Sequence, residues 1–132
     1  LDWRQDFSGF VYYGDQYYDF AKLNGGMKVS YKLIKQGHFS FSKDDKGNVK
    51  IEHKTPEALV TGREKLITFL DNKGIDMCKV NILTSLIYLN MSPMHNEPFD
   101  HFIYNLGKLN LYRSLIESGK LPAMEKLPCF KS

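Results

Sequence analysis

The most apolar segment of the chain lies between Asp76 and Met91, and it predicts a helix that other elements must cover. Its apolar side chains recur at helical spacing and leave little polar surface: Val80, Ile82, Leu83, Leu86, Ile87, Leu89 and Met91. The carboxylate of Asp76 stands where an N-cap accepts hydrogen bonds from the first free backbone N–H groups. We therefore predict a central, buried helix over residues 76 to 91.

A second apolar series predicts the packing partner of this helix. Asn96 stands at an N-cap position, Pro98 falls in the first turn, and apolar residues stay in helical register as far as Ser118 and Gly119. This pattern predicts a helix over residues 97 to 118. The pair Leu83 and Ile87 matches the stripe of Phe102 and Leu106, so we expect the two helices to pack antiparallel.

Two further helices are predicted nearer the start of the chain. Asp15 is the expected N-cap of a helix over residues 15 to 23, which should stop at Asn24-Gly25-Gly26. Thr55-Pro56 begins a helix over residues 56 to 72, although Thr61 and Glu64 also form a capping-box pattern that could start a separate helix.

The segment "HFSFSKDDKGNVKIEH" predicts a β-hairpin over residues 38 to 54. Phe39 and Phe41 alternate with polar residues, Val49 and Ile51 do the same, and residues 44 to 48 have turn chemistry. The segment "MKVSYKLIKQG" before it, residues 27 to 37, fits a strand by alternation and a helix by its three-to-four spacing. The pattern itself leaves both alternatives open.

Length and composition limit the classes of protein that fit. At 132 residues the chain suits a single domain, residues 1 to 132, of mainly α class with one β-hairpin. A net charge of +3, with both signs interspersed, predicts no nucleic-acid partner. A helix-turn-helix around Gly74 is a weaker alternative, because its recognition positions offer only Lys79 as a basic residue.

Cysteine usage and hydropathy bear on the compartment. Cys78 and Cys129 lie far apart and have no metal-binding spacing, so we expect a reducing, cytoplasmic location. The apolar runs are shorter than the roughly 20 residues that span a bilayer, so no membrane partner is expected.

The opening residues suggest a family. "LDW" followed by "YYGDQYYDFAKL" resembles the aminoglycoside phosphotransferase and choline kinase-like family, whose C-terminal lobe has an apolar strand ending in Asp-Trp and then a Gly-Asp-x-x-Tyr-Asp-Leu-Ala-like helix start. The downstream "SLIYLNMSPMHNEPFDHFIYNLGKLNLY" is similar to the last helix pair of a subgroup that includes proteins of bacterial surface-polysaccharide pathways. The resemblance implies the C-terminal helical lobe of a protein-kinase-like α+β fold, with residues 26 to 36 helical.

The resemblance also implies an activity and its residues. In that family the aspartate after the strand binds the Mg²⁺ that bridges the phosphates of ATP or GTP, and by position it is Asp2 here. Asp15 and Asp19 would be structural braces of the following helix. The catalytic loop and the N-terminal lobe should lie upstream of Asp2, so we expect this fragment alone to be inactive. The parent protein would phosphorylate a hydroxyl of a sugar, aminoglycoside-like or choline-like small-molecule acceptor.

Other residues have two interpretations. Tyr17, Tyr18 and His38 could contact substrate in a cleft, although packing explains such aromatics equally well. The cluster of His95, Glu97, Asp100 and His101 places Glu97 and His101 on one helix face, as metal ligands would lie. Acidic residues in a first turn also complement the helix dipole without any metal.

Two further alternatives remain open. Asp6 could add a second carboxylate near Asp2. The alternative to the kinase lobe is a non-catalytic helical interaction module.

Overall fold

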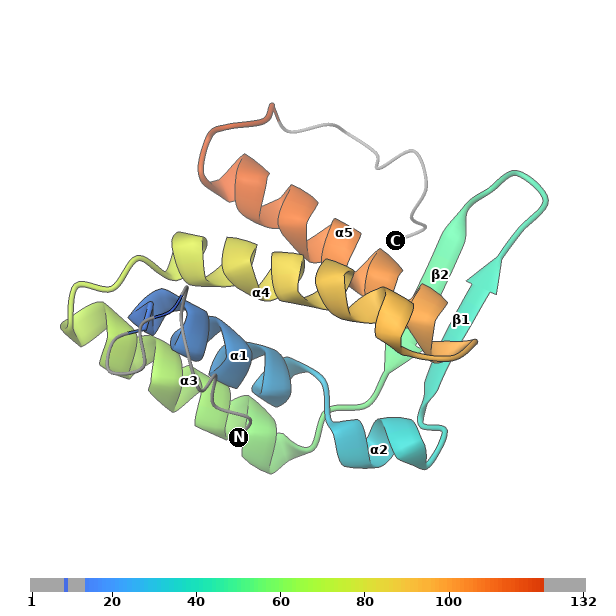
Figure 1. The fold of residues 1–132 in the computed structure, drawn as a ribbon, viewed down its shortest axis with the longest axis horizontal. Helices are drawn as coiled ribbons and strands as arrows, with labels where there is room; N and C mark the ends of the chain where they lie inside the picture. Colours follow the sequence, from blue (N-terminus) through green and yellow to red (C-terminus); the bar gives the residue numbers. More distant parts are fainter. Residues whose placement is uncertain (1–8, 10–13, 123–132) are drawn as a thin grey trace.

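The computed structural model describes residue 9 and residues 14 to 122, and this part is mainly helical with one two-stranded antiparallel sheet (Figure 1). In chain order the elements are α1 (Gln16–Lys28), α2 (Tyr31–Lys35), β1 (Phe39–Lys43), β2 (Val49–His53), α3 (Glu57–Asn72), α4 (Met77–Met91), the 3-10 turn η1 (Ser92–Met94) and α5 (Phe99–Glu117). The prediction of a mainly α fold with one hairpin is confirmed. Among these helices, none has the combined length and apolar character that a membrane span requires.

Helix α4 is the centre of the helical layer. It lies between α1 and α5, and it runs antiparallel to α5 (Figure 1). Asp76 caps it, with its carboxylate accepting from the N–H groups of Cys78 at 2.8 Å and Lys79 at 3.3 Å. The predicted central helix and its antiparallel partner are therefore present.

The buried face of α4 differs from the predicted one. Its buried residues are Val80, Thr84, Ser85 and Tyr88, whereas Leu83 is only partly buried and Leu86 is 45% exposed. Leu83 was expected to mark the contact with α5. Ser85 and Leu89 lie next to Gly107 of α5 instead, while Thr84 and Tyr88 donate hydrogen bonds to backbone carbonyls of α1.

Gly107 marks the closest approach of α5 to α4. A Cβ atom at this position would lie 3.1 Å from the carbonyl oxygen of Ser85 and 3.1 Å from Cγ of Leu89. A side chain at position 107 would be too close to these atoms, so the close packing of α5 on α4 depends on glycine.

The boundary between α1 and α2 corrects two predictions. Asn24-Gly25-Gly26 does not end the first helix, which continues to Lys28, and Gly25 instead packs against the ring of Tyr88. Residues 26 to 36 are not one helix, because Val29 and Ser30 have extended backbone. Ser30 then caps α2, accepting from the N–H of Leu33 at 3.4 Å.

The start of α3 agrees with the predicted helix over residues 56 to 72, whereas the cap of α5 differs from expectation. Helix α3 passes through Gly62 without a break, so the alternative start at Thr61 is wrong. Helix α5 begins at Phe99, and its N-cap is Pro98 rather than the side chain of Asn96. The Glu97–Pro98 peptide bond is cis.

The hairpin packs on the first half of α5. Its register pairs Phe39 with His53 and Phe41 with Ile51, so these side chains lie on one face. The ring centroid of Phe39 lies 5.2 Å from that of the fully buried Phe102. The predicted hairpin over residues 38 to 54 is confirmed, and it extends the core beyond the helices.

Candidate functional site

The Gly14-Asp15 motif forms the start of α1. The Asp15 carboxylate accepts a hydrogen bond from the backbone N–H of Tyr17 at 2.9 Å, as an N-cap residue does. Asp19 is exposed in the first turn, where its charge complements the helix dipole. Asp2, the expected magnesium ligand, and Asp6 both lie outside the described residues.

Tyr17 connects the start of α1 with the start of α4. Its hydroxyl oxygen accepts from the N–H of Asp76 at 3.4 Å, and the ammonium of Lys79 lies 3.8 Å from the centre of its ring. The side chain is partly buried and packs on the cluster formed by Leu66, Leu70 and Val80. Tyr17 therefore packs in the core and makes a cation–π contact with Lys79.

Of the three predicted substrate contacts, Tyr17 and Tyr18 lie next to each other on α1, and His38 lies apart from them. Tyr18 is partly buried and lies on α1 next to Tyr17, with the Lys22 ammonium 5.8 Å from its ring centre. His38 is exposed at the junction of α2 and β1, where its backbone N–H donates to the carbonyl of Leu33 at 2.9 Å. That junction and the start of α1 lie at opposite ends of the molecule (Figure 1). His38 is therefore separate from Tyr17 and Tyr18.

A buried polar network connects α1, α3 and α4. Asn24 on α1 is 0% exposed, and its amide nitrogen donates to Oγ1 of Thr84 at 2.9 Å and to Oδ1 of Asn81 at 3.2 Å. Its carbonyl oxygen accepts from Nε of Arg63 on α3 at 2.8 Å. Every hydrogen bond of the network fixes one side chain relative to another helix, so the Arg63 guanidinium is held in place.

Lys28 follows Asn24 by one helical turn and therefore lies on the same face of α1. Burial lowers the pKa of its ammonium to about 8, and the positive charge of Arg63 acts in the same direction. Glu117 partly opposes the shift in pKa, while Arg113 adds to it. The backbone carbonyl of Lys28 accepts from Oγ1 of Thr55 at 2.9 Å, which attaches the end of α1 to the segment before α3.

The hydroxyl of Tyr88 completes this polar cluster. It donates to the carbonyl of Gly25 at 2.8 Å, and burial raises the pKa of Tyr88 well above its usual value while the Arg63 charge opposes the rise. Arg63 therefore acts electrostatically on both Lys28 and Tyr88. We call Asn24, Lys28, Arg63 and Tyr88 the Arg63 cluster; it carries two cationic side chains and two neutral polar ones.

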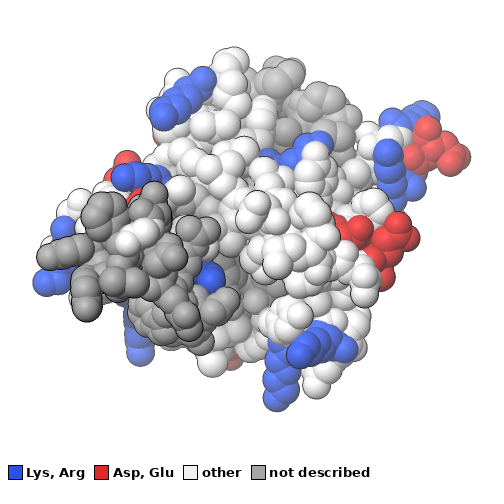
Figure 2. All heavy atoms as spheres, in the orientation of Figure 1, with Lys and Arg blue, Asp and Glu red and all other residues white. Residues whose placement is uncertain are grey.

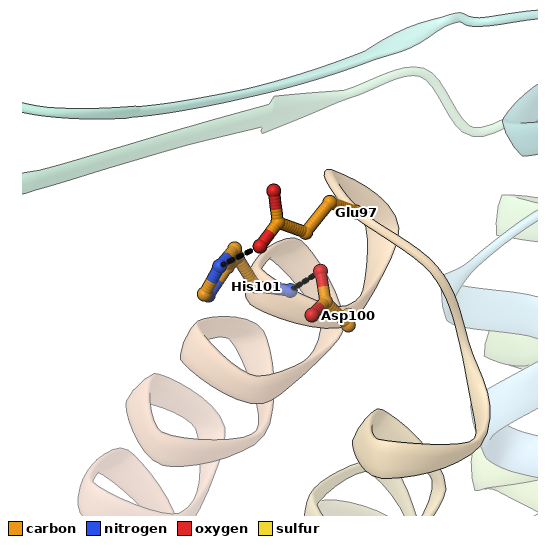
Figure 3. Close-up of side chains that lie close together, drawn as sticks. All are labelled: Glu97, Asp100 and His101. Atoms are coloured by element: carbon orange, nitrogen blue, oxygen red, sulfur yellow. Dashed lines mark hydrogen bonds and ion pairs between the residues drawn. The ribbon is translucent and has the colours of Figure 1, made fainter.

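Glu97, Asp100 and His101 form a second cluster at the start of α5 (Figure 3). One ligand atom from each lies within 4.8 Å of the others, and Nε2 of His101 is 3.5 Å from Oε1 of Glu97. An oxygen of Asp100 already accepts from the N–H of His101 at 2.6 Å. The imidazole stacks on the ring of Phe41, with centroids 5.3 Å apart.

This second cluster fits a packed helix start at least as well as a metal site. Glu97 and His101 are exposed, and the two carboxylates lie where they complement the helix dipole. His95 packs edge-on against Phe99 with ring centroids 4.8 Å apart, so it has a packing role. In the view of Figure 2, most of the visible acidic side chains lie at the hairpin end of the molecule, next to basic ones, and further basic side chains are scattered over this face.

The sequence patterns did not single out the Arg63 cluster. Asn24 has the pattern of a helix stop because Gly25 and Gly26 follow it, and Lys28 lies in the ambiguous segment. The three arginines, Arg4, Arg63 and Arg113, are dispersed along the sequence and stand in no Gly-rich phosphate-binding loop. The available signal was a pair of polar residues at helical spacing, Asn24 and Lys28, on the face of α1 that other helices cover.

Comparisons with known proteins returned no match to a family model, a curated protein or a solved structure.

Proposed function

We propose that this chain is the C-terminal lobe of a small-molecule phosphotransferase. The intact protein would transfer a phosphoryl group from ATP or GTP to a hydroxyl of a sugar, aminoglycoside-like or choline-like acceptor. The observation that supports this most is the start of α1, where Asp15 of the Gly-Asp-x-x-Tyr-Asp motif caps the helix with a 2.9 Å hydrogen bond. The resemblance to the kinase-like family requires a helix to begin at this motif.

The arrangement after α1 is compatible with the proposal. The chain continues through a short helix, a hairpin and an antiparallel helix pair, and α4 lies between α1 and α5. This scaffold would fix the start of α1 and, with it, the segment that carries Asp2. The helices would hold the proposed active site in position, and only some of the catalytic groups would come from this chain.

Asp2 is the proposed magnesium ligand of the intact enzyme. A carboxylate is the kind of hard oxygen donor that Mg²⁺ prefers, and the metal would neutralise charge on the phosphate oxygens during transfer. The aspartate that orients the acceptor hydroxyl and the lysine that binds the nucleotide phosphates would come from upstream of Asp2. The fragment of residues 1 to 132 should therefore bind the metal weakly and transfer no phosphate.

The test is an activity screen of the longer natural protein that contains this segment. It would be incubated with Mg²⁺ and either ATP or GTP, and with sugars, aminoglycosides and choline as acceptors. The proposal expects acceptor-dependent formation of the nucleoside diphosphate and a phosphorylated acceptor. A folded protein that is inactive with the whole panel would favour a non-catalytic helical module instead.

A further inference from the structure

We propose that the Arg63 cluster is a binding site for a phosphate group, held between the guanidinium of Arg63 on α3 and the ammonium of Lys28 on α1. This inference does not depend on the phosphotransferase activity, because it is argued only from the contacts and charges of residues on α1, α3, α4 and α5. The ligand class is an oxyanion: free phosphate or the phosphate group of a larger molecule.

The first argument is the way in which Arg63 is held. A guanidinium has five N–H donors, of which the Nε–H is used by Oδ1 of Asn24 at 2.8 Å. Asn24 is itself fixed by Thr84 and Asn81 on α4. The Nη groups make no hydrogen bond with the described residues, so their N–H groups are held in place and can donate to a ligand.

The second argument is the balance of charge. Within the described part of the chain, the ion pairs are Lys50 with Glu52 and His101 with Glu97, so neither Lys28 nor Arg63 has a carboxylate partner within 4 Å. Both cations are partly removed from water, and they repel each other. A half-buried pair of like charges is unfavourable unless an opposite charge joins it, and a phosphate would supply that charge.

The third argument is the chemistry of the neighbours. Arginine and lysine are the side chains that proteins use for phosphate, the first as an oriented fork and the second as a point charge. Among the residues that the structure describes, the other charged or titratable groups named around Lys28 are Glu117 and Arg113 of α5, Tyr88 of α4 and His53 of β2, whose ring nitrogen lies 3.2 Å from the Lys28 carbonyl. Of these, only Glu117 carries a negative charge at neutral pH, and it makes no ion pair with Lys28.

The test measures binding directly on the protein. Thermal unfolding would be followed in inorganic phosphate, in a nucleoside triphosphate without metal, and in chloride at the same ionic strength. We expect phosphate or the triphosphate to raise Tm above its value in chloride for the wild type and for Lys65→Gln, an exposed lysine on the same helix as Arg63. Lys28→Gln should lose this increase. A response to the triphosphate alone would assign the phosphate to a nucleotide.

A second measurement keeps the proposal testable if a variant does not fold. The ammonium of Lys28 in the wild-type protein would be titrated by ¹⁵N NMR with and without phosphate. A bound anion should raise its pKa from about 8 by about one unit or more. An unchanged Lys28 pKa together with equal Tm values in phosphate and chloride would overturn the proposal, as would a Lys28→Gln variant that keeps the full Tm increase.

Discussion

Arg63 on α3 donates from Nε to Oδ1 of Asn24 on α1 at 2.8 Å, and Asn24 is fully buried. The same amide donates to Thr84 and Asn81 on α4, so one side chain connects three helices. Buried polar groups that lose their partners cost free energy, because water cannot replace the lost hydrogen bonds.

The Asn24 network should therefore contribute measurably to stability. Asn24→Ala would remove the hydrogen bonds that this amide makes with Arg63 on α3 and with Asn81 and Thr84 on α4, and we expect it to lower the free energy of unfolding by about 1–3 kcal/mol. Asn90→Ala removes the same amide from an exposed position on α4 and is the control. The measurement is chemical denaturation of both variants, and equal, small losses would contradict a structural role for the network.

Gly107 and Gly26 should respond to alanine in opposite directions. At Gly107 the new Cβ would lie 3.1 Å from the Ser85 carbonyl oxygen, so α4 and α5 would have to separate, and we expect a net loss on the order of 1 kcal/mol or more. At Gly26, inside α1, nothing lies within 4 Å. Alanine there should stabilise by up to about 1 kcal/mol through helix propensity. Thermal or urea unfolding of the two variants distinguishes them; a stabilised Gly107→Ala would show that the helices are not tightly packed.

Leu70 and Leu83 should differ in their contribution to the core. Leu70 is 0% exposed, and Leu70→Ala should cost about 2–5 kcal/mol. Leu83 is partly buried, so Leu83→Ala should cost clearly less, because a partly exposed site leaves no closed cavity. Urea titrations of both variants give the comparison. The order would be reversed if α4 turned the face carrying Leu83 towards the core.

The lowered pKa of Lys28 predicts a pH dependence of stability. The pKa is about 8 in the folded protein and 10.5 for an ordinary lysine, so the unfolded chain binds more protons between these values. The contribution of Lys28 to stability should therefore increase as the pH rises from about 8, and it is unfavourable below that pH. The raised pKa of Tyr88 acts in the opposite direction only above about pH 10.

The measurement is the free energy of unfolding of the wild type and of Lys28→Met between pH 7 and 10, at constant ionic strength. Lys28→Met removes the charge and keeps most of the apolar stem, so it should abolish the increase assigned to Lys28. It should also be more stable than the wild type at pH 7. Parallel curves for the two proteins would show that the ammonium is well solvated.

Local signals predicted much of the fold. Asp15 and Asp76 were read as N-caps, and both accept hydrogen bonds from the first turns of α1 and α4. The alternating phenylalanines and the turn at residues 44 to 48 predicted the hairpin, where Asp44 accepts from the N–H groups of Lys46 and Asn48. The residues that form these caps and this turn are close in sequence, so the local sequence is enough to predict them.

Features that depend on tertiary contacts were not predictable in this way. Gly25 resembles a helix stop, yet its lack of a side chain serves the close approach of Tyr88, which lies 63 positions away in sequence. Thr84 and Ser85, rather than Leu83, form the buried face of α4 because they hydrogen-bond to the backbone of α1 and α4. The Arg63 cluster likewise assembles from three helices, and the spacing of Asn24 and Lys28 on α1 does not indicate which residues of α3 and α4 join them.

The most direct test of the proposed function is phosphoryl transfer by the longer natural protein with and without the carboxylate of Asp2. Asp2→Asn keeps the size of the side chain and removes its charge, and Asp45→Asn makes the same change at the exposed hairpin turn, at a residue that is not assigned to the metal. Circular dichroism would establish that all three proteins are folded. We predict that Asp2→Asn lowers turnover by about 10²-fold or more, because the carboxylate acts through Mg²⁺ on the transferred group, and that Asp45→Asn keeps it. Equal turnover in the folded Asp2→Asn variant and the wild type would contradict the assignment.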